Sequence, residues 1–244
     1  MELWKQIVEE EGQEVLDLIL TIYVNMYHAE LDVVDLCAHW TPLRPETDEK
    51  FMLIEHAWDE VRHAKFFKGA IKYLGLHWEE IDMNKYLLPD REARFKRMMA
   101  SDDELGVLVG LNMYAEGVHA TEEMVQLYAH KPKYFPVFSK TIAEEERHVN
   151  FGRIVLRRRV EASDTAREKA QQECDYWMQH MEGYLWGDIS RAIDVGIHLG
   201  YLDKDYRIKV CKRFSYVMNS VGLRVNWPST GQLAEAAASF SNVS

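Results

Sequence analysis

A duplicated pair of acidic motifs constrains the fold of this chain more than any other feature. The segment Asn25-Met-Tyr-His-Ala-Glu30 recurs as Asn112-Met-Tyr-Ala-Glu116, and Asp59-Glu-Val-Arg-His63 recurs as Glu144-Glu-Glu-Arg-His148. The upstream glutamates are 86 residues apart (116 − 30), and the glutamates of the second motifs are 85 apart (145 − 60). The chain therefore contains two copies of a helix pair, each with one glutamate on its first helix and Glu-x-x-His on its second.

The spacing within each copy predicts a metal site. Residues three apart on a helix share a face, so the glutamate and histidine of each Glu-x-x-His motif can bind one ion together. With a short connection between antiparallel helices, a separation of 30 residues (60 − 30) or 29 (145 − 116) brings the upstream glutamate to the same height. Four carboxylates and two imidazoles then converge, which is the ligand set of bundle-core di-iron and di-manganese sites. The predicted metal ligands are Glu30, Glu60, His63, Glu116, Glu145 and His148.

The alternative is that these motifs are surface pairs. With ten histidines, about one Glu-x-x-His motif is expected by chance, and a third copy, Glu116-Gly-Val-His119, fits that description. Chance does not explain a duplicated motif with a matched upstream glutamate. Four carboxylates inside an apolar bundle would also be very costly unless cations neutralised them. Oxygen and imidazole donors suit iron or manganese, so we expect two iron ions, or one manganese and one iron.

Further residues near the motifs are candidates for a supporting role. Metal-bound histidines usually donate their second N–H to a carboxylate, so Asp59 is predicted to serve His148, and Glu144 to serve His63. A solvated helix face is the competing interpretation. The remaining candidates lie beside the upstream glutamates: Tyr27 and Tyr114, which would line the pocket or carry electrons, and His119, which would be an extra ligand. For the two tyrosines ordinary core packing is the alternative, and for His119 the alternative is a surface pair with Glu116.

Composition favours an all-helical protein and disfavours nucleic acid as its partner. The 244 residues include 47% hydrophobic residues and only 13 Gly and 6 Pro, which favours helices around a sizeable core. A net charge of −11 disfavours nucleic acid as a partner. Cys37, Cys174 and Cys211 form no CxxC pair and are expected to be reduced, packed thiols. No signal peptide and no membrane span is predicted, so we expect a cytoplasmic protein.

Helix boundaries follow from prolines, glycines and capping residues. Prolines after Trp40 end the first helix, Gly75 ends the second, and Ser101-Asp-Asp-Glu104 resembles a capping box that opens the third. The predicted helices cover residues 2–38, 47–74, 101–130, 135–160, 162 onward and 203–221, with a connector around Trp78, Pro89 and the basic stretch 91–97. The predicted organisation is a single domain over residues 1–226 and a flexible tail over 227–244.

At these motifs the chain resembles the ferritin-like di-iron carboxylate superfamily, over about residues 10–160. The segment Asp59–His63 looks like the corresponding motif of multicomponent monooxygenase hydroxylases and of the epoxidases of aryl-CoA breakdown. His148-Val-Asn-Phe-Gly152 and the following helices look more like aldehyde-deformylating oxygenase. The fold that this resemblance implies is an all-α, ferritin-like four-helix bundle with two additional C-terminal helices.

The function implied by the resemblance is oxygen chemistry. It would be an O2-activating di-iron oxygenase or oxidase, for example a monooxygenase, that acts on a small or lipid-like organic or acyl substrate. In it, Glu30, Glu60, Glu116 and Glu145 would shift between bridging and terminal binding. Electrons would come from an external donor such as ferredoxin and its reductase, and the extra helices would wall a substrate channel or form a homodimer face. Two alternatives stay open: a ferroxidase or peroxide-scavenging, rubrerythrin-like protein, and a non-catalytic scaffold subunit.

Overall fold

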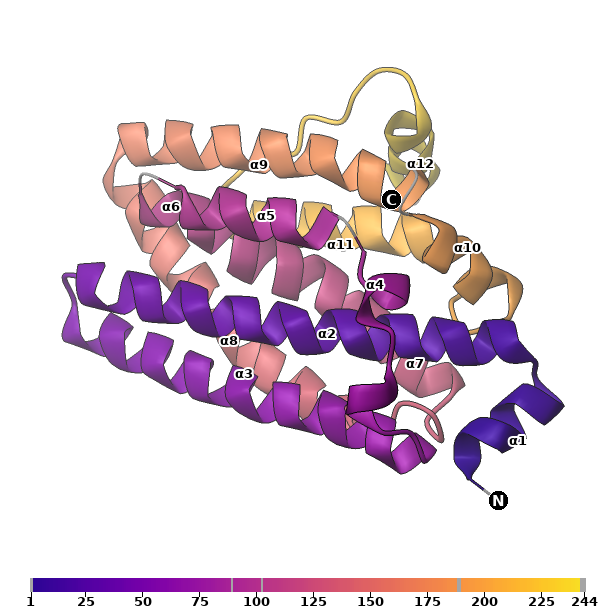
Figure 1. The fold of residues 1–244 in the computed structure, drawn as a ribbon. Coiled ribbons are helices and arrows are strands. Elements are labelled where there is room, and N and C mark those ends of the chain that lie inside the picture. Colours follow the sequence, from indigo (N-terminus) through magenta and orange to yellow (C-terminus); the bar gives the residue numbers. More distant parts are fainter. Residues whose placement is uncertain (1, 89, 102, 188–189, 242–244) are drawn as a thin grey trace. The chain divides into compact units, whose positions relative to one another are not determined.

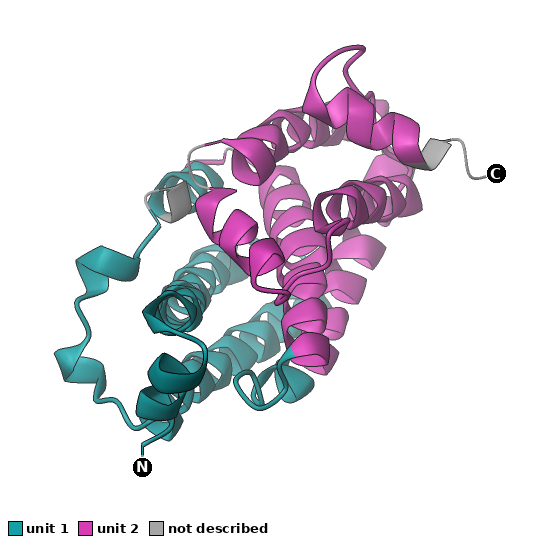
Figure 2. Ribbon diagram, turned by 90° about the vertical axis from the view of Figure 1, so that its right-hand side faces the viewer, with its two compact units in different colours: residues 1–99, 131–141 teal, residues 100–130, 142–244 magenta. Residues whose placement is uncertain are grey.

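The structure is a computed structural model, and it describes residues 2–88, 90–101, 103–187 and 190–241. These residues form helices joined by turns, with no strand among them (Figure 1). None of the helices in this part of the chain has both the length and the apolar character that crossing a membrane requires. The chain divides into two compact units, unit 1 with residues 1–99 and 131–141, and unit 2 with residues 100–130 and 142–244 (Figure 2).

Unit 1 is built on two long helices. α2 (Gln13–Trp40) and α3 (Thr47–Leu74) lie side by side in Figure 1, connected by a short 3-10 turn, η1 (Thr41–Leu43). The turn follows from Pro42, which lacks the amide donor that a continuing α-helix would need. The remaining elements of unit 1 are α1 (Leu3–Glu10), η2 (Trp78–Glu80), α4 (Met83–Tyr86) and α5 (Asp90–Met99).

Aromatic rings from α2, from α3 and from the 131–141 segment pack together within unit 1. The Tyr23 ring lies 6.2 Å from the Phe67 ring and 5.6 Å from the Phe135 ring, and the Phe135 and Phe138 rings stack 5.2 Å apart. All four side chains are fully buried. The Tyr23 hydroxyl donates a hydrogen bond of 2.5 Å to the Tyr134 carbonyl, and burial raises the pKa of this phenol well above its usual range. The 131–141 segment is thus held in unit 1 by a ring cluster and one buried hydrogen bond.

Unit 2 contains the second copy of the motifs. Its helical path from Glu104 to His130 is continuous, and the following long helices are α8 and α9. The elements are α6 (Glu104–Val107), η3 (Leu108–Ala120), α7 (Thr121–His130), α8 (Phe138–Ala162), α9 (Asp164–Trp186), α10 (Arg191–His198), α11 (Tyr206–Ser220) and α12 (Gln232–Ser241). The first residues of α8, up to Thr141, group with unit 1. The Ser163 hydroxyl caps α9 by accepting a hydrogen bond of 3.3 Å from the Ala166 amide.

The middle of this continuous path, η3, is a π-helix. In a π-helix each carbonyl accepts a hydrogen bond from the amide five residues later, instead of four as in an α-helix. The wider turn brings the Asn112 carbonyl to 2.9 Å from where a Cβ on residue 117 would lie, so glycine is required there. The Gly117 carbonyl in turn accepts a hydrogen bond of 2.5 Å from Nε of Arg213 on α11. Burial lowers the pKa of the Arg213 guanidinium, and the hydrogen bond to the Gly117 carbonyl partly replaces the water that this group loses.

The predicted helix over residues 2–38 is wrong at its N-terminal end. Gly12 has a φ of +96°, a conformation that side chains rarely adopt, and it separates α1 from α2. The second predicted helix is confirmed at both ends, because α3 runs from Thr47 to Leu74 and Gly75 follows with a φ of +91°.

The predicted capping box is also corrected. The side chain of Asp103, rather than that of Ser101, accepts a hydrogen bond from the helix, at 3.0 Å from the Leu105 amide. The Ser101 hydroxyl instead donates to the Asp103 carbonyl at 2.9 Å. Two residues of the prediction, Asp102 and Pro89, lie outside the described residues.

Short helices were not predicted in the connector, where α4 and α5 lie, nor before α11, where α10 lies. The segment predicted to be a flexible tail, residues 227–244, contains α12. Leu233 on this helix is 1% exposed, and α12 packs on α11 and α9 within unit 2. Residues 242–244 lie outside the described residues, and the division into one domain and a tail stays a prediction.

The prediction of reduced, packed thiols is confirmed. Cys37, Cys174 and Cys211 are free and buried. Burial raises the pKa of the Cys174 thiol to about 12, with a smaller contribution from Asp175, and burial also raises the pKa of Cys211 to about 12. The thiols of these two cysteines are therefore protonated at neutral pH and unreactive as nucleophiles.

Two glycines in unit 2 provide a matched test of its packing. A Cβ at Gly110 would lie 2.8 Å from the Trp177 ring, whereas a Cβ at Gly183 would meet nothing within 4 Å. We expect Gly110→Ala to lower the free energy of unfolding by about 1–3 kcal/mol through overpacking. Gly183→Ala should raise it by roughly 0.5–1 kcal/mol, because alanine loses less entropy in a helix. Urea denaturation measures both, and an unchanged midpoint for Gly110→Ala would contradict the described packing.

Candidate metal centre

Three of the predicted ligands come together within unit 1. The ligand atoms of Glu30 on α2 and of Glu60 and His63 on α3 lie within 4.8 Å of one another. All three residues are buried, with 7%, 1% and 0% of their surface exposed. The His63 Nδ1 atom lies 2.9 Å from the Glu60 Oε2 atom. The antiparallel hairpin therefore places the upstream glutamate beside the Glu-x-x-His motif, as the spacing predicted.

A fourth residue of this group was missed by the sequence analysis. His56 lies one turn before Glu60 on α3, is 2% exposed, and its Nε2 atom lies 3.0 Å from the Glu60 Oε1 atom. The pattern His56-x3-Glu60-x2-His63 repeats with helical periodicity and puts all three side chains on one face. A search for metal-binding residue types four apart, as well as three apart, would have found it.

The second half of the predicted ligand set lies within unit 2. Glu116 on η3 has a ligand atom within 4.8 Å of one on His148. His148 and Glu145 share a face of α8, and the His148 Nδ1 atom lies 3.5 Å from the Glu145 Oε2 atom. The three residues are 5%, 3% and 2% exposed for Glu116, His148 and Glu145. Each unit thus holds one buried group of carboxylates and imidazoles, and the convergence of all six residues on one point stays a prediction.

Asn112 orients Glu116, and the sequence analysis gave it no role. Its Nδ2 atom donates hydrogen bonds to Glu116 Oε2 at 3.0 Å and to the His148 carbonyl at 3.4 Å. The Asn112 side chain lies against Gly152 on α8, where an added Cβ would be 2.3 Å from the Asn112 Cβ. Glycine at position 152 therefore leaves the space that this asparagine occupies.

Asn25, the corresponding asparagine of the first copy, makes different hydrogen bonds. Asn25 and Glu30 are five residues apart, so on an α-helix their side chains diverge by about 140°. Asn112 and Glu116 are four apart on a π-helix, where each turn holds more residues and the pair lies on one face. Asn25 accordingly bonds the connector, donating to the Tyr86 carbonyl at 2.7 Å and accepting from the Leu88 amide at 2.9 Å.

The acid that precedes each Glu-x-x-His motif differs between the units. Asp59 is buried and pairs with Arg62, three residues later on α3. Glu144 is half-buried and Arg147 is exposed. That Asp59 accepts a hydrogen bond from His148, and Glu144 one from His63, stays a prediction.

The three aromatic candidates pack against neighbouring rings. Tyr27 is half-buried with its ring 4.3 Å from that of Trp78. Tyr114 is fully buried, stacks on Trp177 at 4.9 Å, and its hydroxyl lies 3.2 Å from the Nδ1 atom of His180. The His119 ring lies 4.5 Å from the Tyr114 ring and 4.3 Å from the Tyr184 ring. The contacts of the two tyrosines agree with the alternative of core packing. His119 is 5% exposed, so the alternative of a surface pair is wrong for it, and the functional roles of all three stay predictions.

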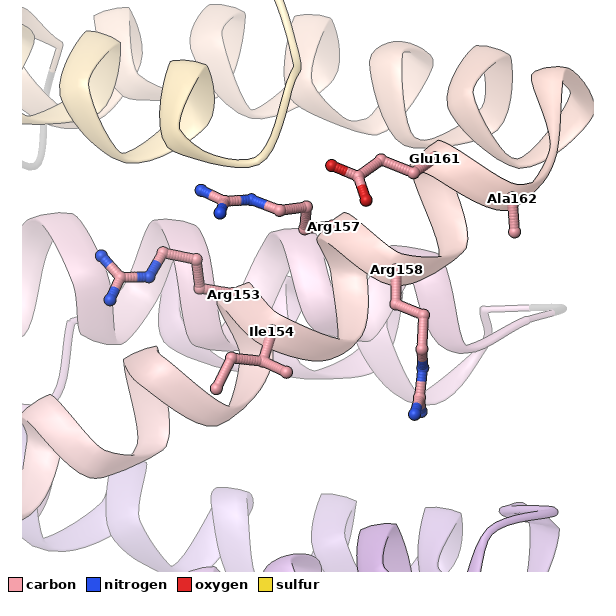
Figure 3. A pocket seen from close by; sticks show the side chains of 6 residues that line it. All are labelled: Arg153, Ile154, Arg157, Arg158, Glu161 and Ala162. Carbon is pink, nitrogen blue, oxygen red and sulfur yellow. The ribbon is translucent and has the colours of Figure 1, made fainter.

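A hollow on the surface of α8 is lined by three arginines, an acid and two apolar residues, which are Arg153, Ile154, Arg157, Arg158, Glu161 and Ala162 (Figure 3). Arg157 donates to the Ser220 carbonyl through Nε at 3.1 Å, and Arg153 donates to the Asn150 amide oxygen at 2.5 Å. Arg158 points away from these two in Figure 3. The arginines of the hollow thus do not point to one common place, as the arginines of a built anion site would.

Comparison with known proteins places the fold. No protein-family model matches the chain, and no curated protein matches it by sequence. Solved structures that match include single-substitution variants of an R2-like ligand-binding oxidase with an aerobically reconstituted Mn/Fe cofactor. One variant has 17% identity and a TM-score of 0.71, with 90% of this chain and 85% of that chain covered. The R2-like ligand-binding oxidase with an aerobically reconstituted metal cofactor, after photoconversion, matches with 18% identity and a TM-score of 0.71 over the same shares.

The chain has the ferritin-like fold. The match extends over nine-tenths of its length, and the R2-like ligand-binding oxidases belong to the ferritin-like dimetal carboxylate superfamily. The predicted all-α, ferritin-like class is thereby confirmed. The resemblance inferred from the duplicated motifs agrees with this result, although it named other branches of the superfamily.

Buried carboxylates should destabilise the metal-free protein. Glu145 is 2% exposed, and an ionised side chain at that depth loses its hydration. We expect Glu145→Gln, which keeps the shape and removes the charge, to raise the free energy of unfolding by about 0.5–2 kcal/mol in chelator. Urea denaturation measures this change. The neighbouring Glu146 is exposed, so Glu146→Gln serves as the control. A lower stability of Glu145→Gln would show that the carboxylate is held for structural reasons.

Proposed function

We propose that this chain is a dimetal oxidase or oxygenase that activates O2 and oxidises a small or lipid-like organic molecule. The proposal has two supports, the buried carboxylate and imidazole groups of the two units and the fold shared with Mn/Fe-containing oxidases. In it, both groups serve one dimetal centre with two iron ions, or one manganese and one iron, bound by Glu30, Glu60, His63, Glu116, Glu145 and His148.

The observation that carries the proposal is the burial of this donor set. Glutamates are mostly exposed in proteins unless they are paired or bind metals, and here the four glutamates and two histidines are all at most 7% exposed. Two divalent cations offset four carboxylate charges. The donor chemistry, oxygen with a minority of imidazole nitrogen, suits iron and manganese better than softer metals. The residues therefore fit the metal pair that the fold relatives contain.

The bound metal pair would supply electrons to O2 and so activate it for the oxidation of the substrate. The protein's part is positioning and the exclusion of water. Glu60 on α3 lies with one oxygen near each of two imidazoles, so both of its oxygens would be available to hold metal. Asn112 holds one oxygen of Glu116 by a hydrogen bond, so this carboxylate has a defined direction before any ion binds.

An apolar environment favours an apolar organic substrate over a polar one. On η3 the residues around Glu116 include Leu111, Met113 and Val118, all at most 2% exposed. Electrons are proposed to come from a separate donor protein of the ferredoxin and reductase kind. Within the described residues the cysteines are buried and far apart in sequence, which does not provide an iron–sulfur ligand set.

The ferroxidase or peroxide-scavenging alternative uses the same ligands and differs in what is consumed. It predicts rapid turnover of Fe²⁺ or peroxide without any organic molecule. The scaffold alternative predicts no metal binding, which the retention and burial of all six donors disfavours.

The deciding experiment compares wild type with two variants of α3. We expect wild type, purified anaerobically, to bind two ions per chain and to consume O2 with a chemical reductant. Glu60→Ala should lose both properties, because Glu60 contacts two imidazoles and is 1% exposed. Glu55→Ala, exposed on the same helix, is the matched control and should keep both.

The measurements are elemental analysis and an oxygen electrode. A full metal content in Glu60→Ala would contradict the assignment of the ligands. Wild type that binds two ions but turns over peroxide faster than it consumes O2 would favour the peroxide-scavenging alternative.

A further inference from the structure

The surroundings of Glu60 contain one more imidazole than the duplicated motif supplies. His63 lies near one carboxylate oxygen, with Nδ1 2.9 Å from Oε2, and His56 lies near the other, with Nε2 3.0 Å from Oε1. The side chains of His56 and Glu60 are each 1% exposed. The carboxylate of Glu60 is therefore placed between two buried imidazoles, one on each oxygen.

The two separations agree with shared metal coordination. Two donors that bind one ion at about 2.1 Å and at right angles lie about 3.0 Å apart. The distance of His56 from Glu60 thus matches that of the predicted ligand His63 from the same carboxylate. With an imidazole beside each of its two oxygens, Glu60 would hold metal together with His63 on one side and with His56 on the other.

The duplication shows that His56 is specific to one copy. With the 85-residue offset of the motifs, position 56 corresponds to position 141, which is Thr141. Thr141 is fully buried, and its hydroxyl donates to the Phe138 carbonyl at 3.3 Å. At this position the second copy thus has a residue that bonds its own helix, whereas the first copy has an imidazole directed at the Glu60 carboxylate.

We infer that His56 is a seventh metal ligand, which binds the ion on the Oε1 side of Glu60. This inference rests on the proposed dimetal function and gives the two ions unequal donor sets. Imidazole suits iron, whereas carboxylate and water suit manganese. The additional nitrogen therefore favours iron over manganese on the Oε1 side.

The test compares His56→Gln with His39→Gln, since His39 is an exposed histidine on α2. Anaerobic titration with Mn²⁺ measures the affinities of the two sites. We expect His56→Gln to weaken the second ion about 10- to 100-fold while the first ion binds as in wild type. After equilibration with equal Fe²⁺ and Mn²⁺, the variant should also retain a smaller share of iron than wild type. Unchanged affinities and an unchanged iron share would overturn the inference.

A second measurement uses wild type alone and does not depend on the folding of a variant. Pulsed EPR of the Mn²⁺-loaded protein, with and without ¹⁵N-histidine, counts the imidazole nitrogens coupled to the metal. Three imidazoles support the seventh ligand, and two overturn it while leaving the proposed function intact. Wild type that binds no ion would overturn the proposed function itself, so the two failures are distinguishable.

Discussion

The dominant constraint on this molecule is the cost of holding ionised carboxylates away from water. Glu60 and Glu145 are buried on helices whose inward faces also carry many apolar residues, and an isolated charge in such surroundings loses its hydration without compensation. Imidazoles three or four residues away, an asparagine amide beside Glu116 and, in the proposed function, two cations are the means by which this cost is offset. Much of the local sequence near the motifs follows from that requirement.

Helices bring the buried carboxylates and imidazoles together without leaving backbone groups unpaired. A helix satisfies its own backbone, so its side chains alone decide what is placed inside, and residues three or four apart reach the same point. The α2 and α3 hairpin uses this to put Glu30 beside Glu60 and His63. In the second unit Asn112 precedes Glu116 by four residues, on a π-helix, and its amide reaches the carboxylate. The two copies of the motif differ by one residue in this spacing and therefore give two different local environments.

The sequence predicted the fold class and the grouping of ligands within each unit, because both depend on periodicity and spacing. The ends of α3 were predictable from the acidic start Thr47-Asp-Glu49 and from Gly75, which act on the backbone locally. The break at Gly12 was not, because a glycine in a polar stretch is compatible with helix until tertiary packing sets its φ. The π-helix also escaped prediction, and its contacts with Gly152 and Arg213 join residues that lie far apart in the chain. His56 was predictable and was missed, because only the three-residue spacing had been considered.

The contact between Asn112 and Gly152 has a consequence for natural sequence variation. The amide that directs Glu116 occupies the volume that a side chain at residue 152 would fill. A chain that acquires a larger residue at 152 must shorten residue 112, and the carboxylate then loses its donor. Related chains that keep this arrangement should therefore conserve the two positions as a pair, although 40 residues (152 − 112) separate them. Where one of the two changes, the other should change with it, together with the polarity around the carboxylate.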